Sequence, residues 1–304
     1  MKSLEDLEEL ITNDGTLSLR SLIYKENFHS NIGALKETKN KFIKPSKLER
    51  FKNKSIKVLD ICFGLGYNSA FLFKELLSQS TKLDWFALEI DKRPLNFSIN
   101  SNFFKNLWDQ KVIEIFESLY KKGNYIDKEF NCKIIWGDAR KKICLIPKHM
   151  KFDLIFLDGF SPQKCPEIWT EEFLSKIKQS LNHRGYLITY SSSAAVRKTL
   201  IDLGLTIYKI KPKIESSANW SNGTIAILNP YFDEYKKNSF LKELSIMELE
   251  HLETKASIPY RDPSFDCTSR EILKNRKDEQ LESNLLPTEV WRKKWHMTKA
   301  PFNS

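Results

Sequence analysis

Short apolar runs separated by amphipathic stretches dominate the middle of the chain. Most of these runs are apolar enough for strands buried on both faces of a sheet, and the predicted strands are Ile56–Ile61, Leu83–Glu89, Cys132–Trp136, Phe152–Asp158, Tyr186–Tyr190, Thr206–Ile210 and Thr224–Leu228. Helical periodicity lies between them, notably at Asn68–Leu77, Arg93–Phe104, Thr170–Leu181 and Ser193–Leu203. Strands that alternate with helices of this length predict right-handed crossovers and a mainly parallel, doubly wound α/β sheet.

The two ends of the chain have a different pattern. Near the start, Asn13-Asp14-Gly15 lies between runs rich in Leu, Ile and Thr, which predicts a β-hairpin over residues 10–24. Beyond Pro230 the pattern is helical: the sequence Thr268-Ser-Arg-Glu271 has the form of a capping box, and a last helix is predicted over about Thr288–His296. We therefore expect a hairpin and basic segment in residues 1–50, an α/β domain in 51–230 and a helical extension in 231–304.

Charge is unevenly distributed along the 304 residues. The formal net charge is +10, yet residues 231–304 hold 13 basic and 13 acidic side chains, so the whole excess lies before them. Between Lys36 and Lys57, nine basic residues face only two acidic ones. Such a cluster either contacts the phosphates of a nucleic acid or forms a solvated face, and the pattern leaves both open.

Composition excludes several classes of protein. No apolar stretch reaches the roughly 18 residues that a transmembrane helix needs, so we expect no membrane partner. The start, MKSLEDLEEL, lacks the basic flank and apolar run of a secretory signal. Five cysteines without a Cys-x-x-Cys pair indicate reduced thiols and no zinc cluster. We expect a cytoplasmic protein that holds no metal.

A glycine-containing turn after the first strand is the first candidate for ligand binding. In Val58-Leu-Asp60-Ile-Cys-Phe-Gly64-Leu-Gly66-Tyr-Asn68, a strand delivers an acid and a Gly-x-Gly turn opens a helix. Glycine lets the backbone turn tightly and approach a ligand, and the helix N-terminus offers free amides. The next strand ends at Glu89, where an acid accepts hydrogen bonds from ribose hydroxyls in nucleoside-binding α/β folds. A nucleoside site and a plain tight turn with a solvated Glu are the two interpretations.

Two further acids follow later strands. Asp138 in Trp136-Gly-Asp-Ala139-Arg is placed to accept from an adenine amino group, to cap the next helix, or to do both. Asp158 follows an apolar strand and precedes a loop that carries Phe160 and Trp169. A fixed carboxylate at that point suits methylation of an amine, because it orients N–H groups and stabilises positive charge on the attacking nitrogen. Either ring suits stacking on a flipped-out base; the alternative is a turn acid with core aromatics.

Taken together, these motifs resemble the methyltransferase half of the bifunctional bacterial enzyme that finishes the 5-methylaminomethyl group on the wobble uridine of tRNA. The segment Asp158-Gly-Phe-Ser-Pro-Gln-Lys-Cys-Pro-Glu-Ile-Trp169 is similar to that family's long D-G/A-F-x-P-x-K-x-P-x-x-W signature. Similar blocks are Phe63-Gly-Leu-Gly-Tyr-Asn68, Thr189-Tyr-Ser-Ser-Ser-Ala-Ala-Val-Arg197 and an N-terminal block from Asn13 to Glu37. The resemblance covers about residues 12–228 and implies a class I methyltransferase fold.

The resemblance implies S-adenosylmethionine as cofactor and tRNA as substrate. The cofactor residues that it and the motifs indicate are Asp60, Gly64, Gly66, Asn68, Glu89, Asp138 and Ala139. It implies that Asp158 and Phe160 are catalytic and face the aminomethyl nitrogen, and the substrate residues that we expect are Glu37, Pro162, Lys164 and Trp169.

Two departures from the family limit what the resemblance implies. There is no second glycine-rich strand–turn–helix for the flavin-dependent oxidase half, so we expect no FAD and a separate enzyme that supplies the aminomethyl precursor. The family's basic, glycine-rich segment after the sixth strand is replaced by Lys211–Trp220, which leaves the exact substrate open.

Other functions remain possible from the sequence. The same fold would suit a methyltransferase or aminopropyl transferase that acts on a small amine or a protein. A catalytically inactive RNA-binding module is the alternative from another class, but four acids at strand ends are not needed in an inactive scaffold.

Overall fold

The computed structural model describes residues 6–211, 223–230 and 238–297. The chain divides into two compact units, Met1–Phe160 and Ser161–Ser304. The predicted domain boundaries after residues 50 and 230 stay predictions.

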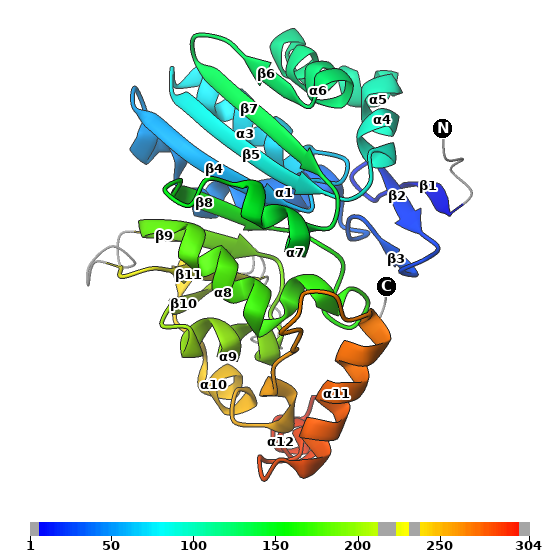
Figure 1. The fold of residues 1–304 in the computed structure, drawn as a ribbon, viewed down its shortest axis with the longest axis vertical. Helices are drawn as coiled ribbons and strands as arrows, with labels where there is room; N and C mark the ends of the chain where they lie inside the picture. Colours follow the sequence, from blue (N-terminus) through cyan, green and yellow to red (C-terminus); the bar gives the residue numbers. More distant parts are fainter. Residues whose placement is uncertain (1–5, 212–222, 231–237, 298–304) are drawn as a thin grey trace. The chain divides into compact units, whose positions relative to one another are not determined.

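The first unit is built on a largely parallel sheet with strand order β6-β7-β5-β4-β8 (Figure 1). Parallel pairing joins β4 to both β5 and β8, and β5 to β7. The short β6 pairs antiparallel with β7 at the edge. The strand bounds are β4 Ser55–Ile61, β5 Lys82–Glu89, β6 Asn124–Ile126, β7 Phe130–Trp136 and β8 Phe152–Leu157. The parallel α/β core predicted from the apolar runs is confirmed.

Parallel register brings the carboxyl ends of these strands to one edge of the sheet. Asp60 is level with Ala87 on β5 and with Phe156 on β8. Glu89 ends β5 opposite Trp136, and the Gly137 amide donates to the Glu89 carbonyl oxygen at 2.8 Å. The predicted acids therefore lie along the edge where open α/β sheets bind ligands.

Helices connect the strands of the first unit. They are α3 Tyr67–Ser78, α4 Arg93–Asn100, α5 Asn102–Lys105, α6 Gln110–Lys122 and α7 Ala139–Lys142, with a 3₁₀ turn, η3, at Ile143–Leu145. The helix predicted over Arg93–Phe104 is interrupted at Ser101, which has extended backbone and accepts a hydrogen bond from Phe104 as the N-cap of α5. Helix α6 is not among the predicted helices.

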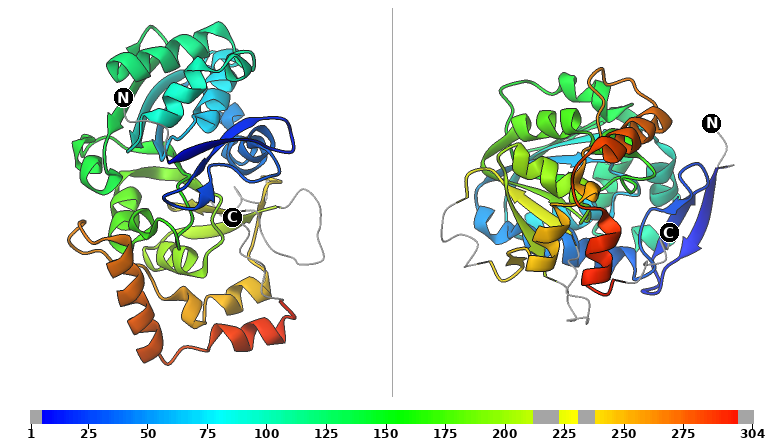
Figure 2. Two further views of the ribbon diagram at one scale, coloured as in Figure 1. Left: turned by 90° about the vertical axis from the view of Figure 1, so that its right-hand side faces the viewer. Right: turned by 90° about the horizontal axis from the view of Figure 1, so that it is seen from below.

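An antiparallel hairpin and a helical segment precede β4. Strands β1 Leu7–Ile11 and β2 Leu17–Ser21 flank the predicted turn, and β3 Glu26–Asn27 pairs with β2. The helical segment follows as α1 Ala34–Thr38, η1 Lys39–Ile43, α2 Lys44–Ser46 and η2 Leu48–Phe51. Figure 2 shows the dark-blue hairpin beside this blue segment.

The turn residue Asp14 ties the hairpin to the helical segment. Its carboxylate accepts from the backbone N–H of Thr16 at 3.1 Å and, through its other oxygen, from that of Lys36 at 3.1 Å. Gly33 has φ +123°, and a Cβ there would lie 1.8 Å from the Asp14 carboxyl carbon. Only glycine fits at that approach, so the turn fixes where α1 begins.

The second unit has antiparallel strands in the order β9-β11-β10-β12. They are β9 Leu181–Thr189, β10 Thr206–Ile210, β11 Thr224–Ile227 and β12 Leu241–Lys242. Strands β9, β10 and β11 were predicted, but β12 was not. The direction of these strands was not predicted either, because an apolar run indicates burial on both faces and not strand direction. The accompanying helices are η4 Pro166–Trp169, α8 Glu171–Ser180 and α9 Ala194–Asp202. Thr170 caps α8 as predicted, accepting from the Phe173 amide.

The later part of the second unit is helical, as predicted. It contains α10 Ile246–His251, η5 Lys255–Ser257, α11 Ser269–Glu282 and α12 Thr288–Lys294. The predicted capping box of Thr268 and Glu271 is present, and Ser245 and Glu248 form another at α10.

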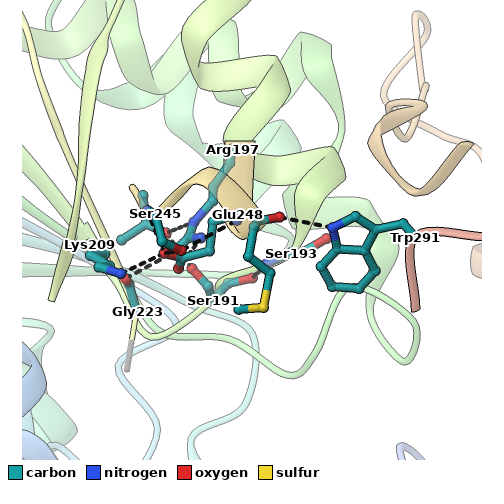
Figure 3. A network of polar contacts seen from close by, with 10 residues as sticks. Ser191, Ser193, Arg197, Lys209, Gly223, Ser245, Glu248 and Trp291 are labelled. Carbon is teal, nitrogen blue, oxygen red and sulfur yellow. Dashed lines mark hydrogen bonds and ion pairs between the residues drawn. The ribbon is translucent and has the colours of Figure 1, made fainter. Parts of the chain in front are cut away.

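A buried ionic cluster joins α10 to the strands of the second unit (Figure 3). Glu248, 1% exposed, lies between Arg197 at 3.0 Å and Lys209 at 2.7 Å. The Arg197 guanidinium also donates to the Thr224 hydroxyl and to the Gly223 carbonyl. Two cations thus share one buried carboxylate, whose loss would leave both without a counter-charge.

Within the described residues, no helix has the length and apolar character needed to span a bilayer. The segment 212–220, in which the sequence departs from the family, lies outside the described residues.

Candidate functional site

The Gly-x-Gly turn and Glu89 form one hydrogen-bonded unit at the sheet edge. The Gly64 N–H donates to Glu89 Oε2 at 2.8 Å, while the amides of Ile90 and Asp91 donate to Oε1 at 2.7 and 2.8 Å. Gly64 has φ +57° and Gly66 has φ +87°. A Cβ on Gly66 would lie 2.6 Å from the rings of both Phe116 and Phe63, so the turn requires glycine there.

Glu89 is held in a defined orientation with little exposure. It is 7% exposed, and this burial raises its pKa. The hydrogen bonds that three backbone N–H groups donate to it oppose that shift. Oε1 accepts two of the amides and Oε2 accepts one, so Oε2 keeps a lone pair for a ligand hydroxyl.

Asp60 contains a buried acceptor that lacks a donor. Its Oδ2 accepts from the Ser69 hydroxyl at 2.6 Å, and Ser69 in turn accepts from the Trp85 indole N–H at 2.9 Å. Asp60 Oδ1 is buried and has no hydrogen-bond partner among the described residues. Burial raises the pKa of Asp60 to about 7; the Ser69 hydroxyl opposes this shift and the Glu89 carboxylate adds to it. Buried acceptors are normally satisfied, so this atom suits a ligand donor or a water.

Asp138 caps α7, which is one of the two roles that the sequence allowed. Its Oδ1 accepts from the Arg140 backbone N–H at 2.9 Å, and its Oδ2 accepts from the Arg140 guanidinium at 2.8 Å. The neighbouring Ala139 is 8% exposed. The adenine role of Asp138 stays a prediction.

Asp158 is joined to Asn68 and through it to the helical segment near the N-terminus. Asn68 Nδ2 donates to Asp158 Oδ2 at 2.6 Å, and Asn68 Oδ1 accepts from the Thr38 hydroxyl at 2.9 Å. Loss of solvent raises the pKa of Asp158 to about 8. The carboxylates of Glu37 and Asp60 add to this shift, while Asn68 and Lys41 oppose it.

Glu37, predicted to bind substrate, is engaged by neighbours in the first unit. Its carboxylate pairs with Lys41 and accepts from the Ser30 amide at 2.8 Å. Burial works against its ionisation, but Lys41, His29 and the Ser30 amide together outweigh that effect, so the pKa of Glu37 lies below its usual value. Lys41 belongs to the basic cluster for which phosphate contact and a solvated face were the two interpretations; in the structure it is half-buried and paired with this acid.

Three aromatic rings from distant parts of the first unit meet beside Asp158. The Tyr24 ring stacks on Phe160 with centroids 4.5 Å apart and an interplanar angle of 26°. Phe28 packs edge-on against Phe160 at 5.0 Å, and a Cβ on Gly64 would lie 3.3 Å from the Phe28 ring. The three rings thus lie next to the glycine turn through Phe28, and Phe160 follows Asp158 by two residues in the chain.

The predicted residues after Phe160 lie in the second unit. Trp169 is 0% exposed and packs edge-on against Tyr190 at 6.2 Å, which fits the alternative of a core aromatic. Pro162 is buried and Lys164 is exposed. Their roles toward a substrate stay predictions.

The basic residues of the cluster from Lys36 to Lys57 differ in their exposure to solvent. Lys36, Lys39, Lys52 and Lys54 are exposed. Lys44 is partly buried and donates to Asn40 at 3.3 Å. The exposed subset is the part of the cluster that is able to meet an anionic partner.

Comparison with known proteins identifies the family of this chain. A family model described as S-adenosyl-L-methionine-dependent methyltransferase matches residues 102–217. The crystal structure of MnmC2 from Aquifex aeolicus is 30% identical, covers 91% of this chain and 86% of its own, and superimposes with a TM-score of 0.75. An uncharacterised protein of Methanocaldococcus jannaschii is 30% identical over 94% of this chain and 77% of its own. The chain belongs to the S-adenosyl-L-methionine-dependent methyltransferase family that includes MnmC2.

The methyltransferase is also related to larger proteins. The tRNA 5-methylaminomethyl-2-thiouridine biosynthesis bifunctional protein MnmC of Leptospira interrogans is 29% identical over 213 residues, which are 66% of this chain and 33% of that protein. This chain thus matches about a third of the bifunctional relative. The family and the class I fold expected from the sequence are confirmed.

The donor set of S-adenosylmethionine suits the acids at the sheet edge. The cofactor presents an ammonium group, two ribose hydroxyls and an adenine amino group, all of them donors. Asp60 has an unsatisfied buried oxygen, and Glu89 is oriented by three amides. These residues fit the cofactor, which supplies an electrophilic methyl group on a sulfonium.

Several groups around Asp158 were not found from the sequence. Thr38, Lys41 and Tyr24 carry no motif that points to the site. Phe28 belongs to the N-terminal block of the resemblance, which was a usable signal. Asn68 was predicted to bind the cofactor, which stays a prediction; its side-chain hydrogen bonds are with Asp158 and Thr38.

Proposed function

We propose that this methyltransferase transfers a methyl group to the side-chain nitrogen of 5-aminomethyluridine at the wobble position of tRNA. The product is 5-methylaminomethyluridine or its 2-thio form. The observation that carries the proposal is the Asp158 carboxylate, which is oriented by Asn68 and followed two residues later by Phe160, whose ring stacks with Tyr24. The relation to MnmC and MnmC2 supports the same substrate.

Methyl transfer to the nitrogen requires a neutral amine beside a fixed negative charge. An aminomethyl group is an ammonium ion near neutral pH, and it must lose a proton before its lone pair attacks the methyl carbon. As the N–C bond forms and the C–S bond breaks, positive charge develops on nitrogen. Because burial raises the pKa of Asp158 to about 8, the reacting form is the ionised one, whose population grows as pH rises through that value. In that form Asp158 accepts an N–H hydrogen bond from the amine and stabilises the positive charge, with Asp60 and Glu37 adding negative potential nearby.

The aromatic surface suits a base that is held out of its stack. The wobble base of an anticodon loop is single-stranded, and such bases are recognised by stacking on aromatic rings. Phe160 comes two residues after Asp158, so a base stacked near this ring would bring its 5-substituent toward the acid. The exposed lysines Lys36, Lys39, Lys52 and Lys54 contribute attraction for phosphates.

We infer that the precursor comes from separate enzymes. No residue described above offers the chemistry to remove a carboxymethyl group, and the proposal includes neither FAD nor a metal. The carboxylate of a carboxymethylaminomethyl substituent would be repelled by the negative charges of Asp158 and Glu37. We therefore expect that form of the tRNA to stay unreacted.

A small amine or a protein amine is the second candidate substrate. The same carboxylate would stabilise such an amine, but neither needs an aromatic stacking surface or a lysine-rich face. An inactive RNA-binding module would require neither an orphaned acceptor on Asp60 nor a bound cofactor.

The experiment is a methyl-transfer assay on defined tRNA. Transcripts or cellular tRNA bearing aminomethyluridine, or its carboxymethylaminomethyl form, are incubated with protein and S-adenosylmethionine and digested to nucleosides for mass spectrometry. We expect one added methyl group on the aminomethyl side chain and no reaction of the carboxymethyl form. Methylation at another tRNA position, or of a small amine alone, would contradict the proposal.

A further inference from the structure

The contacts of Asn68 suggest a role other than the cofactor binding expected from its motif. Asn68 is 8% exposed and lies at the second residue of α3, directly after the glycine turn. Its amide nitrogen donates to Asp158 and its amide oxygen accepts from Thr38. Thr38, the last residue of α1, is 1% exposed. A buried chain of hydrogen bonds therefore runs from α1 through α3 to the end of β8.

The direction of the Asn68 amide follows from its neighbours. The two ends of an amide have nearly the same shape, so the hydrogen-bond network decides which end faces which partner. Against the ionised carboxylate, which only accepts, an amide oxygen at 2.6 Å would oppose two acceptors, whereas the nitrogen there donates. The Thr38 hydroxyl supplies the donor that the amide oxygen then needs.

The hydrogen bond from Asn68 gives the two oxygens of Asp158 different roles. Oδ2 is taken by Asn68, while Oδ1 makes no hydrogen bond with the described residues and is not among their buried unsatisfied atoms. Oδ1 is thus the oxygen open to a ligand. Fixing one oxygen of a carboxylate also stops the group from rotating, which keeps the other oxygen in one place for the reaction.

We propose that Asn68 is a positioning residue for methyl transfer: its amide, oriented by the Thr38 hydroxyl, holds Asp158 Oδ2 and leaves Asp158 Oδ1 to bind the substrate amine. This inference rests on the proposed role of Asp158. It separates Asn68 from the cofactor residues Gly64, Gly66 and Glu89. It also gives the N-terminal hairpin a function, because Asp14 and Gly33 fix the start of the helix that ends at Thr38.

The pKa of Asp158 tests this proposal, because a purely structural role of Asn68 would leave that pKa unchanged. The charged groups that act on it are Glu37 and Lys41 from the helical segment, and Asp60 from β4. Asn68 favours the ionised form, since a donor at a carboxylate oxygen stabilises the charge. Without that donor, Asp158 should ionise at higher pH, by about one to two pH units for a hydrogen bond to a charged group.

The test follows the Asp158 carboxyl carbon by ¹³C NMR as pH is varied, with the signal assigned by its loss in Asp158→Asn. We expect Asn68→Leu to move the midpoint to higher pH, Thr38→Val to move it in the same direction, and Thr38→Ser to restore it. Thr38→Val removes only a hydroxyl and keeps the side-chain volume, so it serves if Asn68→Leu does not fold. The acidic limb of the methyl-transfer rate should move with the NMR midpoint, while the affinity for S-adenosylmethionine stays unchanged.

Unmoved midpoints in Thr38→Val and Asn68→Leu would overturn the inference. A weaker cofactor affinity in Asn68→Leu without a moved midpoint would overturn it as well and return Asn68 to the cofactor site. A wild-type protein that leaves aminomethyluridine tRNA unmethylated would instead overturn the proposed function, because the carboxyl titration needs no tRNA.

Discussion

The backbone N–H of Gly64 donates to Glu89 Oε2 at 2.8 Å, which ties the turn after β4 to the end of β5. Two residues 25 positions apart thus set one corner of the candidate cofactor site. The carboxylate that we expect to hold the ribose also shapes the turn that approaches the cofactor. Binding and turn geometry are therefore coupled at this corner.

Glu89→Ala should weaken S-adenosylmethionine binding by about 1.5–3 kcal/mol, the range for a hydrogen bond to a charged group. Calorimetry on wild type and variant measures this directly. Glu114→Ala, which removes an exposed acid on α6, is the matched control and should bind normally. Equal affinity of Glu89→Ala and wild type would remove Glu89 from the cofactor site.

Replacing the exposed lysines Lys36, Lys39, Lys52 and Lys54 with Ala should weaken tRNA binding and flatten its salt dependence, because each lost phosphate contact releases fewer counterions. The control changes four exposed lysines elsewhere in the first unit, Lys82, Lys122, Lys128 and Lys133. Log affinity is measured against log salt for both variants. The same slope in the first variant and in wild type would mean that the cluster is only solvated.

Glu248→Leu should lower the free energy of unfolding by about 3–5 kcal/mol, the range for leaving a buried charge without its partner. Arg197 and Lys209 would both lose the carboxylate that they share. Glu250→Leu is the matched control on the same helix, since its pair with Lys294 lies at the surface, where solvent screens the two charges, and should contribute little. Urea unfolding compares them, and equal losses would contradict the account of the cluster.

Asp158→Asn should make the protein more stable than wild type at pH 8. The pKa of Asp158 is raised from 3.8 to about 8 in the folded protein, so folding binds a proton between these values. Wild-type stability therefore falls as pH rises through this window, whereas the amide of the variant does not titrate. The stability difference between variant and wild type should grow from pH 4 to pH 8 in urea unfolding. A difference independent of pH would show that Asp158 ionises normally.

Much of the first unit was predictable because its signals are local. Buried apolar runs located β4, β5, β7 and β8, and their parallel register brought the acids that follow them to one edge. Helix α6 was missed although Val112, Phe116 and Leu119 recur at helical spacing on its buried face. The antiparallel direction of β10 and β11 has no local signal, since a strand buried on both faces has the same composition in either direction.

The contacts around Asp158 were less predictable because they join distant residues. Asn68 lies 90 positions before Asp158, and nothing in the motif distinguishes a side chain that holds a cofactor from one that holds another side chain. Tyr24 and Phe160 also stack, although they are even farther apart in the sequence. Lys41 had the sequence environment of a solvated lysine, and only the fold paired it with Glu37.

The most direct test of the proposed function compares single-turnover methyl transfer by wild type and Asp158→Asn on tRNA that carries aminomethyluridine at the wobble position. Asparagine keeps the shape and one hydrogen-bonding oxygen but removes the charge. We predict a rate lower by roughly 10²–10³, the effect of losing one preorganised electrostatic group, with S-adenosylmethionine affinity unchanged. A wild-type rate in Asp158→Asn would contradict the role of Asp158, and a wild type that leaves this tRNA unmethylated would contradict the proposed function.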